Sequence, residues 1–432
     1  IVGGPLWRDQ LMEVGDEIQL VRQEDGDAVD IRAMRLDDAI KLIKGSKGSM
    51  VYLTVKKVDG NIETIPVKRD LVVLEESYAR STVINRQDQK YGLIHLPKFY
   101  VDFKSYKERN AAHDVEQEVI NLKEAGVGGL IIDLRNNGGG SLQTVVDIAG
   151  LFIDEGPIVQ VKSTVSKTEV LRDRDGKTLW NGPMVILVNE LSASASEILA
   201  AAMQDYERAI VIGSEQTFGK GTVQNVVDLN GFLSNSTYGN LGALKITTDK
   251  FYRINGGSTQ LEGVKSDVIT PDRYRYVDVG ERDEDNPMRW DRISPLVYTK
   301  WNGYLNYDDV IDKSQDRVND HPIFNLVDQD AKWIEQRQND NTIALNYQEY
   351  VSKIESDRAY ADQFDAVEEY DNNLDFTISP ADQKRISEDD IFLEKRERWF
   401  SNLSKDFYVE EAVNILQDLK VGIYQQEPLA RK

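Results

Sequence analysis

Two stretches of this chain repeat the same order of local patterns: a short apolar run, a turn of small residues, and a segment with helical spacing. In the first, residues 129–134 precede apolar positions spaced as in a helix over 142–149. In the second, residues 184–188 precede a helical stretch at 198–203, and another apolar run follows at 209–213. Strand–helix–strand units of this kind pack their helices on the faces of a sheet. The sequence therefore predicts an α/β fold with a mixed sheet and covering helices.

Pattern and composition divide the chain into three regions. Residues 1–73 combine a helical spacing over 36–43 with the alternating run 50–55, which indicates a strand. Residues 74–275 hold both strand–helix units. Residues 276–432 are polar, acidic and mostly helical, with an apolar stripe from Val409 to Leu419. Four of the six tryptophans lie in this last region and indicate a packed domain: Trp290, Trp301, Trp333 and Trp399.

Composition narrows the classes of partner. The formal net charge is −22, so we expect no binding to nucleic acid, whose phosphates would be repelled. No apolar run reaches the roughly 20 residues that cross a bilayer, and we expect neither an integral membrane segment nor a signal peptide in this chain. The absence of cysteine excludes disulfides and thiolate catalysis and fits an oxidising compartment. The three histidines lie far apart, so we expect no metal and no cofactor.

Serines and alanines alternate over residues 192–196, where the second helix begins. A serine at a strand-to-helix turn lies beside free backbone N–H groups that can bind an oxyanion. A structural role also fits, because Ser194 and Glu197 have the Ser-x-x-Glu spacing of a helix capping box. The small alanines leave room for a substrate backbone. They favour Ser194 as a nucleophile, with the N–H of Ala195 facing the carbonyl under attack.

A single lysine stands between two glycines, which permit close approach of the backbone to a partner. As a general base, Lys220 must lose its charge, so burial must lower its pKa from about 10.4 towards 7–8. Gln224 is a candidate to orient the amine. A fully extended strand would hold these two residues about 13 Å apart, so we expect a bend at Gly221.

Two further features flank this candidate site. The triglycine 138–140 follows a strand and precedes a helix, so it is either a flexible turn or a second source of N–H groups for an oxyanion. Asp205 comes eleven positions after Ser194. On one helix that spacing is roughly 16 Å along the axis. We therefore expect no contact between these two residues, and a structural or helix-end role for Asp205.

In combination these motifs resemble the tail-specific proteases, also called C-terminal processing peptidases, of the S41 serine peptidase family, in their long periplasmic type. The matching segments are Asp133-Leu-Arg-Asn-Asn-Gly-Gly-Gly140, Ser192-Ala-Ser-Ala-Ser-Glu-Ile198, Thr217-Phe-Gly-Lys-Gly-Thr-Val-Gln224 and Phe251-Tyr-Arg-Ile-Asn-Gly-Gly-Ser-Thr-Gln260. The acidic helical region is also typical of this type. Residues 1–73, with a Gly-Asp-x-Ile turn at Gly15, resemble a PDZ domain without its first strand and carboxylate-binding loop.

The resemblance implies both a fold and a set of site residues. The fold would be a crotonase-like mixed α/β peptidase core at 74–275, preceded by a partial PDZ domain at 1–73 and followed by a helical C-terminal domain at 276–432. The oxyanion hole would combine the N–H groups of Ala195 and Gly139. The implied catalytic residues are the nucleophile Ser194, the general base Lys220, Gln224 beside the lysine, and Asp205 in an indirect role.

We therefore predict a serine endopeptidase that forms an acyl-enzyme with proteins carrying exposed, apolar, unstructured C-terminal tails. The resemblance also implies a periplasmic location, and an adaptor protein is a candidate partner. One alternative is a non-catalytic PDZ scaffold, which the intact serine and lysine motifs disfavour. Another is a hydrolase or isomerase of small thioesters on the same core. The missing cofactor motif and the peptide-binding module disfavour that enzyme.

Overall fold

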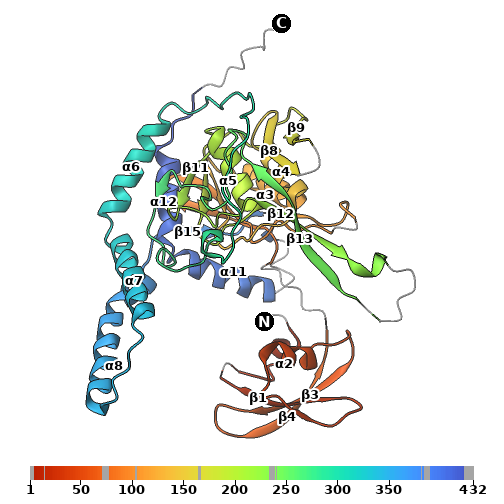
Figure 1. Cartoon of the computed structure of the whole chain (residues 1–432). Helices are drawn as coiled ribbons and strands as arrows, with labels where there is room; N and C mark the ends of the chain where they lie inside the picture. The colour runs from red at the N-terminus through yellow and green to blue at the C-terminus, as the bar shows by residue number, and fades with distance from the viewer. Residues whose placement is uncertain are drawn as a thin grey trace. The chain divides into compact units, whose positions relative to one another are not determined.

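The computed structural model describes residues 4–13, 15–70, 77–102, 105–163, 167–232, 239, 241–380, 382–383 and 390–422. The chain forms two compact units, and Figure 1 colours it by residue number. The first unit comprises residues 1–75 with 385–397, and the second comprises residues 76–384 with 398–432. Each unit has hydrophobic clusters of its own.

A four-stranded antiparallel sheet forms the body of the first unit, in the order β2–β1–β3–β4. Its strands are β1 (Glu17–Gln23), β2 (Val29–Asp30), β3 (Met50–Lys56) and β4 (Ile62–Lys68), accompanied by helices α1 (Pro5–Arg8) and α2 (Leu36–Ile43). The predicted helix over 36–43 and strand over 50–55 are confirmed as α2 and β3. Alternation along β3 buries Val51, Leu53 and Val55 in the core of this unit.

A seven-stranded mixed sheet is the centre of the second unit, in the order β14–β11–β10–β7–β6–β5–β15. The pairs from β14 to β6 are parallel, and β5 and β15 add antiparallel at one edge. The strands are β5 (Arg80–Arg86), β6 (Gln89–His95), β7 (Leu130–Asp133), β10 (Met184–Val188), β11 (Ile210–Gly213), β14 (Val268–Ile269) and β15 (Asp375–Thr377). The mixed sheet and its strands β7, β10 and β11 confirm the prediction.

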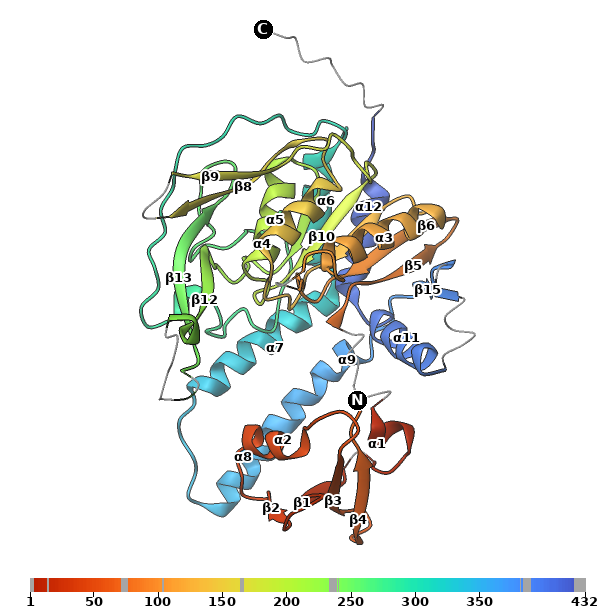
Figure 2. The same cartoon turned by 90° about the vertical axis from the view of Figure 1, so that its right-hand side faces the viewer.

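Helices cover both faces of this sheet, as Figure 2 shows. Ile132 and Ile186 belong to the core on the face of helices α3 (Ala111–Glu124), α4 (Leu142–Gly150) and α5 (Ala195–Asp205). Ile131 and Val185 belong to the core on the face of α6 (Tyr307–Asp320), α7 (Pro322–Asn339) and α12 (Phe407–Asp418). A strand buried on both faces needs a continuous apolar run, which explains why these strands lack an alternating pattern.

The second unit also holds a four-stranded antiparallel sheet in the order β12–β13–β8–β9. Its strands are β8 (Gly156–Ser163), β9 (Glu169–Asp173), β12 (Thr222–Asp228) and β13 (Ala243–Tyr252), with the short helix η2 (Leu229–Phe232) after β12. The ribbon of β12 and β13 projects from the rest of this unit in both Figure 1 and Figure 2. Strand β12 begins two residues after Lys220, so the lysine lies at the base of this ribbon.

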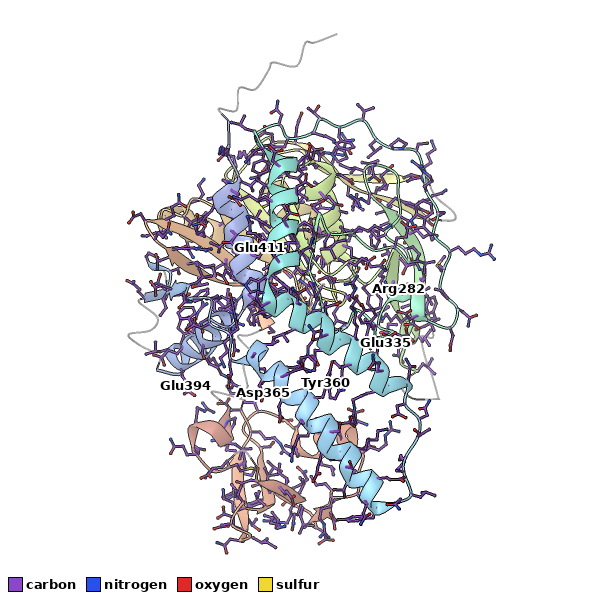
Figure 3. The ribbon with its side chains drawn as sticks, turned by 90° about the vertical axis from the view of Figure 1, so that its left-hand side faces the viewer. Arg282, Glu335, Tyr360, Asp365, Glu394 and Glu411 are labelled. Atoms are coloured by element: carbon purple, nitrogen blue, oxygen red, sulfur yellow. The ribbon has the colours of Figure 1, made fainter. Side chains whose placement is uncertain are left out.

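The C-terminal part of the second unit is mostly helical, as predicted. Its further elements are η3 (Glu281–Asp283), α8 (Tyr347–Ala361), η4 (Asp362–Phe364), α9 (Asp365–Glu368) and α11 (Asp390–Leu403), of which the part from Arg398 belongs here. Buried Glu411 of α12, labelled in Figure 3, accepts hydrogen bonds from the side chains of Ser314 and Arg317 of α6. None of the described helices is both long and apolar enough to cross a bilayer.

Candidate active site

Ser194 occupies the turn between β10 and α5 in a backbone conformation that serine rarely adopts. Its φ is +57° and its ψ is −109°. Holding a residue other than glycine at positive φ costs about 1–3 kcal/mol, and such strain clusters at functional sites. The strand-to-helix turn is therefore as sharp as the sequence predicted.

The two outer serines of the motif have structural roles. Ser192 and Ser196 are fully buried. The Ser192 hydroxyl donates to the carbonyl of Leu134 at 2.9 Å, and the Ser196 hydroxyl donates to the carbonyl of Asn137 at 2.8 Å. The middle serine differs from both. Ser194 is only half-buried, and its hydroxyl donates to no carbonyl in the described part of the chain. Of the three hydroxyls, this one is available for chemistry.

The carboxylate of Glu197 joins the serine motif to the lysine motif. This side chain is fully buried and accepts backbone N–H hydrogen bonds from Ser194 at 2.6 Å, Gly219 at 2.7 Å and Lys220 at 3.0 Å. The hydroxyl of Thr217 donates a fourth hydrogen bond at 2.7 Å. Burial raises the pKa of Glu197, and the four hydrogen bonds counter part of that shift. The predicted capping role of Glu197 is present, but the same carboxylate also positions both halves of the candidate site.

Lys220 lies half-buried, and its amine donates to Oε1 of Gln224 at 3.0 Å. The sequence predicts this contact only if the stretch between the two residues departs from a fully extended strand. The structure has such an irregularity in β12, a register shift between Val223 and Gln224. Burial lowers the pKa of Lys220, and the like charge of Lys245 lowers it further, while Glu281 and Glu197 act in the opposite direction. In the described part of the chain, no hydrogen bond joins the Lys220 amine to the Ser194 hydroxyl.

The triglycine loop lies against the nucleophile turn. A Cβ atom built on Gly139, whose φ is +98°, would approach Cβ of Ser194 to 2.8 Å and the nitrogen of Ala195 to 3.0 Å. The N–H of Ala195 has no hydrogen-bond partner among the described residues, which fits an oxyanion donor. The N–H of Gly139, in contrast, donates to Oδ1 of Asn137 at 2.9 Å. In this conformation Gly139 is therefore close to the site, and its N–H group is occupied by the side chain of Asn137.

Asp205 ends α5, the helix that Ser194 begins, and contacts neither Ser194 nor Lys220. Its carboxylate accepts hydrogen bonds from Arg253 at 2.7 and 3.1 Å and from Asn255 at 2.7 Å. This partly buried ion pair connects the C-terminal end of α5 to the segment that follows β13. The absence of contact with Ser194 agrees with the predicted helix-end position.

Two amide side chains that the sequence patterns did not single out also shape the site. Besides holding Gly139, buried Asn137 donates from its side chain to the carbonyl of Leu96 at 2.7 Å. Buried Gln260 accepts from the N–H of Gly221 at 2.9 Å and donates to Glu281 at 3.0 Å. Both amides lie in motif segments, and that position was the only signal that the sequence carried. Within the described ranges, no cluster of three histidine or acidic side chains could hold a metal ion.

Two family models match the chain. Residues 90–270 match the model described as peptidase family S41, and residues 274–421 match the model of the C-terminal domain of tail-specific protease. The first match covers the parallel strands of the mixed sheet together with Ser194 and Lys220, and leaves out β5 and β15. The second match covers the helical C-terminal part.

Individual proteins show the same similarity. The chain is 35% identical over 364 residues to the tail-specific protease of Haemophilus influenzae, covering 83% of this chain and 50% of that protein. It is 37% identical over 207 residues to the carboxyl-terminal-processing protease of Picosynechococcus, covering 47% of this chain and 46% of that protein. The chain thus spans about half the length of these relatives. A solved structure of the photosystem II D1 C-terminal processing protease is 28% identical, with a TM-score of 0.39, and covers 62% of this chain and 66% of that one.

Proposed function

The chain belongs to peptidase family S41, and from that membership and the geometry around Ser194 we propose that it is a serine endopeptidase with a Ser194–Lys220 dyad. One observation carries the proposal. The backbone N–H groups of Ser194 and Lys220 both donate to Oε2 of Glu197, at 2.6 and 3.0 Å. The serine motif and the lysine motif are therefore both anchored on one buried carboxylate oxygen, which supports a common site for the two residues.

The proposed reaction proceeds through an acyl-enzyme. Oγ of Ser194 forms a bond to the carbonyl carbon of the scissile peptide while the neutral amine of Lys220 takes the hydroxyl proton. The C–N bond then breaks, and Lys220 returns that proton to the departing amine. Water attacks the resulting ester, again with Lys220 as the base, and frees Ser194 and the new carboxylate.

Backbone donors would stabilise the oxyanion that forms at the carbonyl. Ala195 supplies one free N–H at the start of α5. Gly139 could supply a second only after its N–H leaves the side chain of Asn137. The Lys220 amine must likewise approach the Ser194 hydroxyl while Gln224 keeps it oriented. We propose that substrate binding brings about both adjustments, with Asp205 acting indirectly through Arg253.

We propose three domains: a partial PDZ domain at 1–73, a crotonase-like peptidase core at 74–275 and a helical C-terminal domain at 276–432. The PDZ domain would bind exposed, apolar C-terminal tails of protein substrates, and an adaptor protein would be a further partner. A periplasmic location agrees with the absence of cysteine. The alternative of a non-catalytic scaffold is disfavoured, because the relatives matched over most of the chain are named proteases.

A fluorophosphonate probe and a protein substrate with a disordered, apolar tail test the proposed activity. We expect the probe to label the wild type at Ser194, as mapped by mass spectrometry, and the Ser194→Ala variant to lose both labelling and cleavage. Lys220→Ala should lose at least about a hundredfold in rate, since general base catalysis contributes that much. Cleavage that survives in Ser194→Ala, or a label at another residue, would remove the assignment.

A further inference from the structure

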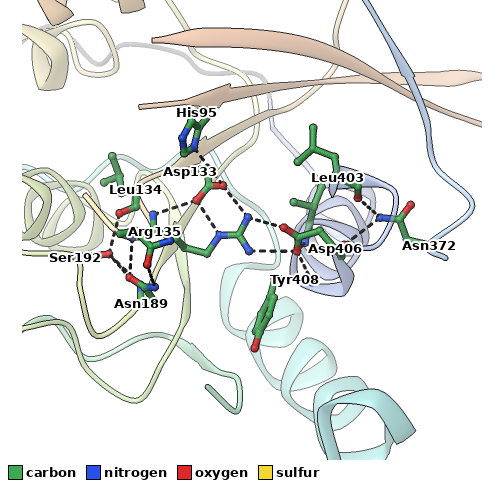
Figure 4. Close-up of polar contacts among 12 residues, drawn as sticks. His95, Asp133, Leu134, Arg135, Asn189, Ser192, Asn372, Leu403, Asp406 and Tyr408 are labelled. Atoms are coloured by element: carbon green, nitrogen blue, oxygen red, sulfur yellow. Dashed lines mark hydrogen bonds and ion pairs between the residues drawn. The ribbon is translucent and has the colours of Figure 1, made fainter. Parts of the chain in front are cut away.

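A network of charged side chains connects the C-terminal part of the second unit to the loop beside the nucleophile (Figure 4). The guanidinium of Arg135 donates to Asp133 at 2.9 and 2.7 Å and to Asp406 at 2.7 and 3.2 Å. The side chains of Arg135 and Asp406 are only 18% and 17% exposed, so water screens this ion pair little. Burial would raise the pKa of Asp133, but Arg135 and His95 lower it below its ordinary value.

From Arg135 the next two residues lead directly to the nucleophile turn. Asn136 has a φ of +61° and exchanges hydrogen bonds with the side chain of Asn189, at 2.9 and 2.8 Å. The carbonyl of Asn137 accepts from the N–H of Ala193 at 3.0 Å and from the Ser196 hydroxyl at 2.8 Å. Ala193, directly before Ser194, and Ser196, two residues after it, are therefore both hydrogen-bonded to the loop that Arg135 begins.

The other end of the network is equally well held. Asp406 is the N-cap of α12 and accepts from the N–H groups of Tyr408 at 3.0 Å and Val409 at 3.1 Å. The side chain of Asn372 donates to the carbonyl of Asp406 at 3.0 Å. The apolar face of α12 lies in the core beneath the mixed sheet. The Asp406 carboxylate is thus held in place by the backbone of its own helix, independently of its ion pair with Arg135.

We infer that Asp406 is a positioning residue for the reaction: through Arg135 it holds the loop 134–137 and hence the nucleophile turn. This inference rests on the proposed function and names a part of the C-terminal region on which that function depends. Asp406 touches no reacting atom. Its effect is on alignment, and a displacement of about 1 Å at a reacting group can reduce a rate about a hundredfold.

The Asp406→Asn variant tests this inference because asparagine caps helices as well as aspartate does but cannot pair as an anion with Arg135. A matched control is Glu411→Gln, which weakens a partly buried ion pair between the same helix and Arg317 and does not involve Arg135. Both variants are assayed well below their thermal transitions. We expect Asp406→Asn to lower kcat about tenfold or more with KM nearly unchanged, and Glu411→Gln to keep kcat within about twofold.

A double-mutant cycle separates alignment from general loss of stability. If the two residues act as one unit, Arg135→Gln should lower kcat as Asp406→Asn does, and the double variant should be no worse than the more affected single variant. A wild-type kcat in Asp406→Asn, or equal losses in Asp406→Asn and Glu411→Gln, would overturn the inference. An inactive wild type would instead refute the proposed function.

Discussion

The proton affinity of Lys220 is set by its burial and by three charged neighbours. Burial lowers its pKa most, Lys245 lowers it further, and Glu281 and Glu197 raise it. Lys245 lies on β13 opposite Val226 of β12, two residues beyond the Gln224 that receives the lysine amine. Only the neutral amine can take a proton from Ser194, so this balance sets the pH range in which the proposed reaction proceeds.

Opposite shifts of the pH–rate profile should follow when these charges are removed one at a time. Activity should rise with pH as Lys220 loses its proton. Lys245→Gln removes a like charge, raises the pKa of Lys220 and moves the rising limb to higher pH. Glu281→Gln removes an opposite charge and moves the limb to lower pH, while its amide oxygen can still accept from Gln260. The measurement is kcat/KM against pH for the wild type and both variants.

Salt provides the control for this pair of variants. Lys245 is exposed, so its effect is small and should shrink as ionic strength rises. Shifts in the same direction for both variants, or a wild-type rate that falls with pH over the neutral range, would contradict a lysine base.

Much of the fold at the level of helices and strands could be predicted from local patterns. The continuous apolar runs predicted β7, β10 and β11 because a sheet covered on both faces has no polar side. Helical spacing predicted α2, α4 and α12. Most apolar residues of α4 and α12 are buried, whereas in α2 only Ala39 is buried. Strand β15 was missed. Its three residues have no recognisable period, and they pair with β5 almost 300 positions earlier in the chain.

In the candidate site, too, residues within local motifs could be predicted, whereas contacts between distant segments could not. Ser194 and Lys220 could be identified because each lies in a compact motif with unusual neighbours. The four hydrogen bonds to Glu197 and the engagement of Gly139 by Asn137 could not, because they depend on how separate segments pack. The predicted capping box explained Glu197 correctly but incompletely, since spacing along one helix says nothing about the lysine loop that packs on it.

Helix α12 should contribute strongly to the stability of the second unit. Ile415 is fully buried in the core between this helix and the sheet. Ile415→Ala should lower the free energy of unfolding by about 2–5 kcal/mol, from lost apolar burial and the cavity left behind. Urea denaturation would measure the loss. Ile354→Ala on α8, where the side chain is 47% exposed, is the matched control and should change stability by less than about 0.5 kcal/mol. Equal effects would contradict the core assignment.

At the scale of the whole molecule, the proposed chemistry and the proposed tail recognition reside in units with separate cores. Val51, Leu53 and Val55 form part of one cluster in the first unit. The second unit has two clusters, one on each face of its mixed sheet. Because the clusters share no residue, damage to one core can be used to separate the contributions of the two units.

Leu53→Ala, at a side chain that is 1% exposed, should destabilise the first unit by about 2–5 kcal/mol. We expect cleavage of a tail-bearing protein to fall while the rate of fluorophosphonate labelling at Ser194 stays near the wild-type value. Val58→Ala, at a 68% exposed position of the same unit, should alter neither. A labelling rate that falls together with the unfolding of the first unit would contradict this separation of roles.

The positive φ of Ser194 also bears on how such a chain would change if it lost its activity. Glycine adopts this backbone geometry without steric strain, so replacing the serine there would relieve about 1–3 kcal/mol of strain, against an entropic cost of about 0.5–1 kcal/mol for glycine. Selection for stability alone would thus favour replacement of Ser194 by glycine. A descendant of this chain retained only as a binding module would be expected to drift to glycine at that turn, and finding glycine there would mark it as a pseudoenzyme.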